Sequence, residues 1–221
     1  MQQHLQSIFQ RKLPVMKKAL ITAACSIAIV SMAAVYSAVT SPRRSLDRFL
    51  AQVATVEVGK TRLDEWRRRV ERDKYSIFTT GCDQQTCGIG WRGENGLLQR
   101  LHLAPRTVVD ASVGFEDGIA TGTYIILTIG KRDEHGEWRD DKGVVVQQSR
   151  TKIPSECLQD YRVDVLKRYG IGDRFWATVG MESCVAPAAR ARAIAINTSC
   201  LTKIGSCKTV EEMLPRVFSY R

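Results

Sequence analysis

Cysteine is the residue type with the most chemistry to offer in this sequence. Seven cysteines occur among 221 residues, and Cys25 lies within a long apolar segment while the other six follow it. An even number of cysteines beyond an export signal is typical of a disulfide framework. Short sequence separation favours two pairs and leaves a third: Cys82–Cys87, Cys200–Cys207 and Cys157–Cys184. Other connectivities stay open at this point.

A metal site is the alternative use of these cysteines. Structural zinc is held by closely spaced cysteine pairs that are completed by a second pair of cysteine or histidine ligands. The two close spacings, with four and six residues between the cysteines, touch or exceed the limit of that pattern, and only His102 and His135 follow the apolar segment as further ligands. We therefore expect no metal and no cofactor. Disulfide formation would also remove the free thiol that a Cys–His dyad requires.

Two further motifs invite a ligand, and each has a simpler interpretation. Residues 88–93 form a literal G-x-G-x-x-G, but phosphate binding by this motif requires a helix directly after it. A turn and a strand are expected there, so we interpret the motif as a hairpin with glycine kinks. Residues 133–141 are rich in acidic side chains that suit calcium. They lack the EF-hand spacing and are interpreted as a solvated hairpin tip.

Histidine chemistry gives one enzymatic hypothesis. His102 or His135 would act as general base in an extracytoplasmic hydrolase, with an acid from residues 133–141. The sequence has no G-x-S-x-G nucleophile motif. No catalytic residue is therefore assigned, and the interpretation leans away from an enzyme.

Two groups of side chains suggest a binding surface instead. Trp91 and Arg92 follow the Cys82–Cys87 loop, where an exposed tryptophan would anchor a protein partner. A basic run within residues 62–72 would suit anionic lipid or another polyanion, although interleaved acidic residues favour a solvated helix face. The candidate residues of this run are Arg62, Arg68, Arg69 and Arg72.

Residues 19–39 are an uncharged run of the length that spans a bilayer. This segment bears on the cellular compartment in which the candidate residues lie. They predict either a transmembrane anchor or a cleaved signal peptide, preceded by a basic tail at residues 1–18. Two lysines directly after Met16 are typical of a secretory start. A linker is expected at residues 40–45. The predicted disulfides indicate that the rest of the chain lies outside the cytoplasm.

Residues 46–151 are expected to form one α+β domain. An amphipathic helix is predicted from Leu63, with its apolar positions on one narrow arc. From Tyr75 the apolar positions alternate with period two, which predicts a run of strands that includes residues 97–103. Because short turns connect them, these strands predict an antiparallel meander. The turn signals are Asn95-Gly96 and Asp117-Gly118.

Residues 152–221 are expected to be a mixed, helix-containing extension. A helix is predicted over residues 156–168 and a strand over residues 174–179. Thr209 and Glu212 form the pattern of a capping box before a short terminal helix. The fold class is therefore α+β, with an N-terminal transmembrane or signal helix, then a helix and an antiparallel meander, then a disulfide-tied C-terminal part.

The net charge of +10 is weak support for a nucleic-acid partner. Part of the surplus lies in the N-terminal segment, as Arg11, Lys12, Lys17 and Lys18. The remaining surplus is ordinary for a soluble domain, so we expect no nucleic-acid partner. A composition of 44% hydrophobic and 25% charged residues excludes a wholly disordered or collagen-like chain.

Residues 46–103 resemble a module of small envelope lipoproteins and β-lactamase-inhibitor-like proteins. The similarity lies in the order of elements: a helix, then residues 58–61 (VGKT) opening a second helix that contains Trp66, then antiparallel strands. The Gly-x-Pro that usually follows this helix in the family is absent here. The resemblance implies a non-enzymatic scaffold or protein-binding role and assigns no binding residues.

These observations favour an exported, membrane-tethered domain without catalysis, which binds a protein or another envelope component. The membrane itself is a partner through residues 19–39 if they are not cleaved. The chain is expected in the cell envelope, either as a single-pass membrane protein or as a secreted or periplasmic one after cleavage. The alternatives are an extracytoplasmic hydrolase and a binder of anionic lipid or polyanion surfaces.

Overall fold

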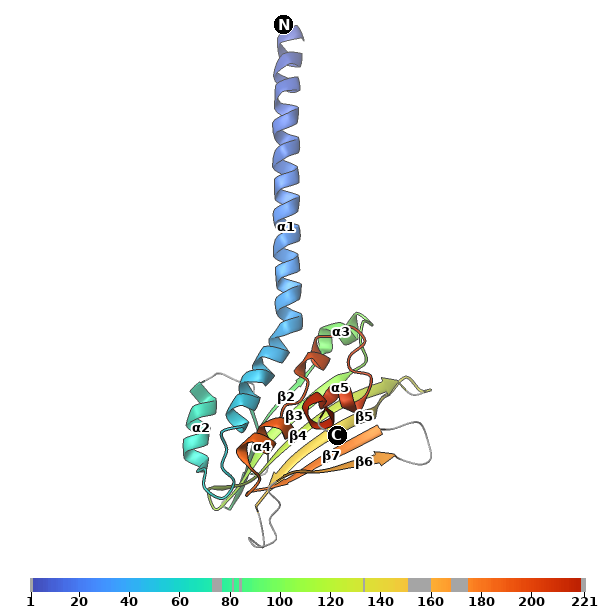
Figure 1. Cartoon of the computed structure of the whole chain (residues 1–221). Coiled ribbons are helices and arrows are strands. Elements are labelled where there is room, and N and C mark those ends of the chain that lie inside the picture. The colour runs from blue at the N-terminus through green and yellow to red at the C-terminus, as the bar shows by residue number, and fades with distance from the viewer. Residues whose placement is uncertain are drawn as a thin grey trace. The chain divides into compact units, whose positions relative to one another are not determined.

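The structure is a computed structural model, and it describes residues 2–72, 77–80, 82–83, 85–132, 134–150, 160–167 and 175–219. The chain divides into two compact units, Met1–Thr40 and Ser41–Arg221. We call Ser41–Arg221 the folded unit. Helix α1 (Gln2–Val53) contributes to both units (Figure 1). Its segment from Ile21 is long and apolar enough to cross a membrane, by length and composition.

The folded unit is built on a mixed sheet with strand order β1-β2-β3-β4-β5-β7-β6. Neighbouring strands from β1 to β5 are antiparallel, as the meander prediction requires. The predicted α+β class with an apolar N-terminal helix is therefore confirmed. The strands are β1 (Ile77–Thr80), β2 (Thr86–Glu94), β3 (Thr107–Glu116), β4 (Ile119–Arg132), β5 (Trp138–Ser149), β6 (Arg162–Lys167) and β7 (Phe175–Glu182).

The turn between β3 and β4 shows why the sequence folds into a meander here. Asp117 and Gly118 both have positive φ, at 50° and 73°. A two-residue turn of this kind matches the right-handed twist of the strands that it joins. Only residues that tolerate positive φ can occupy it, and the Asp-Gly pair does. The turn predicted at this position is therefore confirmed.

The C-terminal strands extend the same sheet in a way that the sequence did not indicate. Strand β7 pairs with β5 in parallel, and β6 pairs with β7 antiparallel as the outer edge strand. Residues 162–167 were predicted as part of a helix, and this prediction is wrong. Their apolar positions fit the period of a helix as well as that of a strand. The edge of β7 offers a full ladder of backbone hydrogen bonds, and this favours the strand.

A second difference lies between β2 and β3. The prediction of a strand at residues 97–103 is wrong, because a short helix, α3 (Gly96–Arg100), begins there. Asn95 does not form a hairpin turn. Its side-chain amide donates to the Pro105 carbonyl at 2.8 Å, and its Oδ1 accepts from the Thr107 N–H at 2.9 Å. Asn95 thus ties together the two ends of the α3 excursion, which the sequence pattern alone does not reveal.

The helices of the folded unit pack on one face of the sheet (Figure 1). Phe49 of α1 and Trp66 of α2 are fully buried, with ring centroids 5.7 Å apart in an edge-on arrangement. Trp66 also lies 5.9 Å from Phe115 of the sheet. Residues 40–45, the predicted linker, are helical as part of α1. The other helices are α2 (Leu63–Arg72), α4 (Pro187–Ala193), η2 (Thr198–Leu201), α5 (Val210–Met213) and α6 (Pro215–Phe218).

Candidate functional site

The structure confirms two of the predicted disulfides, Cys82–Cys87 and Cys200–Cys207. Cys184 is also disulfide-bonded, and its predicted partner, Cys157, lies outside the described residues. Cys25 is a free thiol on the exposed surface of α1. Disulfides persist in oxidising compartments and are rare in the cytosol, so these bridges suggest an oxidising, extracytoplasmic environment for the folded unit.

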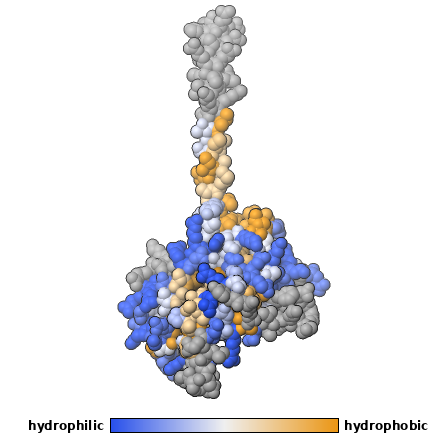
Figure 2. Space-filling view, viewed as in Figure 1, coloured by the Kyte–Doolittle hydropathy of each residue, from blue (hydrophilic) through white to orange (hydrophobic). Residues whose placement is uncertain are grey.

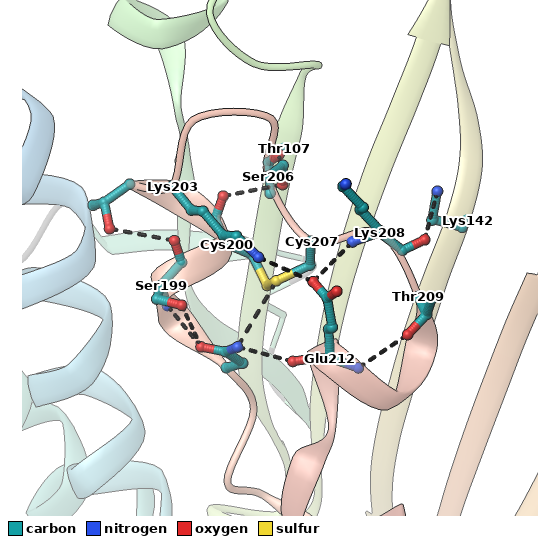
Figure 3. The surroundings of a disulfide bond; sticks show 12 residues. Thr107, Lys142, Ser199, Cys200, Lys203, Ser206, Cys207, Lys208, Thr209 and Glu212 are labelled. Carbon is teal, nitrogen blue, oxygen red and sulfur yellow. Dashed lines mark hydrogen bonds and ion pairs between the residues drawn. A yellow bond between two sulfur atoms is a disulfide. The ribbon is translucent and has the colours of Figure 1, made fainter.

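The Cys200–Cys207 bridge closes a loop that Ser206 fixes to strand β3 (Figure 3). Ser206 is fully buried with a φ of 57°. Its hydroxyl shares a hydrogen bond of 2.7 Å with the Thr107 hydroxyl and lies 3.0 Å from the Cys200 carbonyl. These contacts hold the loop onto β3, so whatever the loop exposes is presented by a rigid support.

Glu212 fixes the same loop from the side of α5 (Figure 3). Its carboxylate accepts a hydrogen bond from the Lys208 backbone N–H at 3.1 Å and from the Lys203 ammonium at 3.2 Å. These donors lower the pKa of Glu212, with the backbone N–H as the largest cause. The Glu212 N–H donates to the Thr209 hydroxyl at 3.3 Å, which confirms the predicted helix cap.

Trp91 is not the exposed anchor that the sequence suggested. Only 3% of its surface is exposed, and its ring lies against the position that a Cβ on Gly93 would occupy. Cys87, Ile89 and Trp91 alternate along β2 and point to the same buried face. This period-two pattern continues through Trp91, so the sequence did carry a signal for burial at this position.

Arg92 is exposed on the opposite face, which the helices leave bare. Its Nε lies 3.6 Å from Oδ1 of Asp110, the residue directly across on β3. Burial raises the pKa of Asp110, and Arg92 offsets part of that rise. Apart from this ion pair, Oδ1 of Asp110 accepts no hydrogen bond from the described residues. Oδ1 of Asp110 is therefore a buried carboxylate oxygen that rests on the ion pair with Arg92.

The predicted basic surface on α2 is partly neutralised by acidic neighbours. Arg62 and Arg68 both lie 3.5 Å from the carboxylate of Asp64. Arg69 pairs with Glu65 one turn away. The side chain of Arg72, the last residue of the predicted group, lies outside the described residues. Since opposite charges alternate over one helix face, this surface carries little of the positive field that a polyanion needs.

The two histidines of the hydrolase hypothesis lie in different settings. His135 is 73% exposed on the β4–β5 loop and lies 3.6 Å from Glu134. His102 lines a hollow of about 290 Å³ together with Arg132 and Trp138. The described residues that line this hollow offer one base, His102, and one cation, Arg132, but neither a carboxylate nor a hydroxyl or thiol nucleophile. In the part of the chain that the structure describes, no group of three or more acidic, histidine or cysteine side chains is placed for a metal ion.

The bare face of the sheet carries side chains that the sequence analysis missed. Tyr124 at the middle of β4 is 40% exposed, although it lies on a central strand. Trp176 of β7 lies over Gly143, where a Cβ would come within 2.7 Å of its ring. Registers place the following side chains on this face, which we call the bare face: Arg92, Asp110, Tyr124, Ile126, Asp164 and Trp176.

The outer strands continue the bare face as a shallow polar hollow of about 190 Å³. Asp160, Arg162 and Asp164 line it from β6 and the residues before it, and Glu182 lines it from β7. Aromatic and apolar side chains at the centre of the face are thus bordered by charges of both signs. The period-two alternation predicts which side chains share a face of one strand. It does not predict the strand order that brings these residues together.

Comparison with protein-family models, with curated proteins and with solved structures found no match for this chain. The resemblance of residues 46–103 to envelope lipoprotein modules therefore stays a prediction.

Proposed function

We propose that this protein is an extracytoplasmic binding domain that stays attached to the membrane through α1 and acts without catalysis. Its partner is a protein of the same envelope compartment, and the bare face is the surface that binds it. The described disulfides support the extracytoplasmic placement, because cytosolic thiols are kept reduced. The apolar segment of α1 supports the attachment, with the folded unit outside the cytoplasm as a single-pass protein.

The observation that carries the proposal is the exposure of Tyr124 in the middle of the sheet. Tyrosine and tryptophan at the centre of a surface patch supply much of the binding energy in protein interfaces, and surrounding polar residues exclude water. Tyr124 and Ile126 of the central strand β4 have this position, Trp176 lies further out on β7, and the border includes ion-paired Arg92 and Asp110.

Membrane attachment is tested on the protein isolated from the cells that make it. Mass spectrometry of its N-terminal peptide shows whether residues 19–39 are retained, and alkaline carbonate shows whether the chain resists extraction. We expect retention and resistance. A chain that begins after residue 39 and is found in the soluble fraction would contradict the anchor while leaving the binding surface to be tested separately.

The binding surface is tested by placing a photo-reactive amino acid at Tyr124 in those cells. The matched control carries the same amino acid at Ala191, which is exposed on α4. We expect one discrete protein adduct from position 124, absent from position 191, and its loss when Ile126→Arg is added. Equal labelling from both positions, or an adduct that survives Ile126→Arg, would refute the proposed surface.

A further inference from the structure

Exposed apolar side chains of the folded unit gather at one place outside the bare face. In the described part of Ser41–Arg221, four large apolar side chains are exposed, and three of them are Leu101, Leu103 and Ile204. Their exposed fractions are 53%, 42% and 70%. We call these three residues the apolar tip. In Figure 2 strongly hydrophobic side chains gather over α3, the element that Leu101 and Leu103 follow.

The apolar tip is built from two segments that are joined and supported. The Gly205 N–H donates to the Leu103 carbonyl at 2.9 Å, which places Ile204 beside the two leucines. Ile204 lies inside the loop that the Cys200–Cys207 disulfide closes and that buried Ser206 holds to the sheet. An isoleucine that is exposed on a rigid support does not withdraw into the core, so the apolar tip is preorganised to contact something apolar.

Cations and an aromatic ring border the apolar tip. Leu103 also lines the hollow that contains His102, Arg132 and Trp138. The Arg132 guanidinium lies 5.2 Å from the centre of the Trp138 ring. Arg100 is exposed at the end of α3. Apolar side chains beside arginine and tryptophan are the combination that suits the interface of a membrane, where acyl chains meet phosphate groups.

The connection between the apolar run of α1 and the folded unit is short. The apolar run ends at residue 39, and the first fully buried residue of the core is Leu46. Seven helical residues span only about 10 Å, which is comparable to the headgroup layer. Within the folded unit, α3 lies at the end where residues 41–53 of α1 enter (Figure 1).

We propose that the apolar tip rests in the interfacial layer of the membrane that holds α1, with Arg100 and Arg132 against lipid phosphates. This contact gives the folded unit a second attachment beside α1 and fixes its orientation on the membrane. The bare face is thereby held at a constant angle to the bilayer. The inference rests on the membrane attachment proposed above and goes beyond it, since an anchor alone leaves the folded unit free to rotate.

The experiment uses the full chain, reconstituted through α1 into vesicles of phosphatidylglycerol and phosphatidylethanolamine. Flotation with the vesicles is checked first, and a chain that fails to float overturns both the anchor and the inference. A photo-reactive amino acid replaces Ile204 in one sample and the exposed residue Ala191 in the control. We expect at least tenfold more lipid adduct from position 204 than from position 191.

Two further variants keep the result specific to the apolar tip. Leu101→Asp with Leu103→Asp should lower the lipid adduct at position 204 at least tenfold without changing flotation. Both leucines are exposed, so their replacement leaves the core intact. Arg132→Glu should lower the lipid adduct at position 204 several-fold. Equal lipid adducts at positions 204 and 191, or an adduct from position 204 to protein in place of lipid, would overturn the inference while leaving the anchor intact.

Discussion

Phe49→Ala tests the conclusion that α1 is part of the core of the folded unit as well as an apolar anchor. The Phe49 side chain is fully buried, and its ring meets Trp66 edge-on. Burial of such a ring contributes about 2–3 kcal/mol, and the aromatic contact adds about 1 kcal/mol. Because Trp66 and Phe115 are themselves held in the core, the cavity cannot collapse. We therefore expect a loss of about 3–4 kcal/mol in the free energy of unfolding.

The measurement is urea unfolding of the full chain in detergent, with disulfides intact, followed by tryptophan fluorescence. All four tryptophans lie in the folded unit, so the signal reports that unit alone. With a slope of about 2 kcal/mol per molar urea, the midpoint should fall by about 1.5–2 M. The control is Asp47→Ala, which removes an exposed ion pair with Arg43 and should cost about 0.5 kcal/mol or less. Equal midpoints for the two variants would refute the packing of Phe49 in this core.

Three other variants probe other parts of the folded unit by the same unfolding measurement. Replacing Cys200 and Cys207 by serine should cost about 2.5 kcal/mol from the entropy of the loop they close, and a variant as stable as wild type would contradict this role. Arg190→Met should cost about 2 kcal/mol, because the guanidinium donates to two carbonyls just beyond the end of α1, and an unchanged midpoint would argue against those bonds. Burial raises the pKa of Asp110, so its folded form loses stability as pH rises through that pKa. Asp110→Asn should therefore have a higher free energy of unfolding than wild type at about pH 7, and this difference should shrink towards about pH 4. A difference that grows on acidification would contradict this reasoning.

Local patterns were sufficient for several features of this protein. An uncharged run of bilayer length identified the apolar helix, and the Asp117-Gly118 pair identified a turn that only such residues can adopt. Short separation identified the Cys82–Cys87 and Cys200–Cys207 disulfides. Each of these depends on neighbours in sequence, which is why the sequence determines it.

The surfaces depended on contacts between residues distant in sequence. Tryptophan is a residue type typical of exposed binding anchors, yet Trp91 lies on the strand face that the helices cover. Residues 162–167 became a strand because the edge of β7 was open.

The sequence by itself therefore determined the apolar helix, the α+β class, the antiparallel run and the two close disulfides, because these follow from spacing and backbone preference. Only the tertiary structure decided which face of the sheet is bare and which loops meet at the apolar tip. Ile204 and Leu103 are far apart along the chain and are brought together by the hydrogen bond from the N–H of Gly205, the next residue after Ile204, to the Leu103 carbonyl. No local pattern encodes such a meeting, since it results from packing of the whole folded unit.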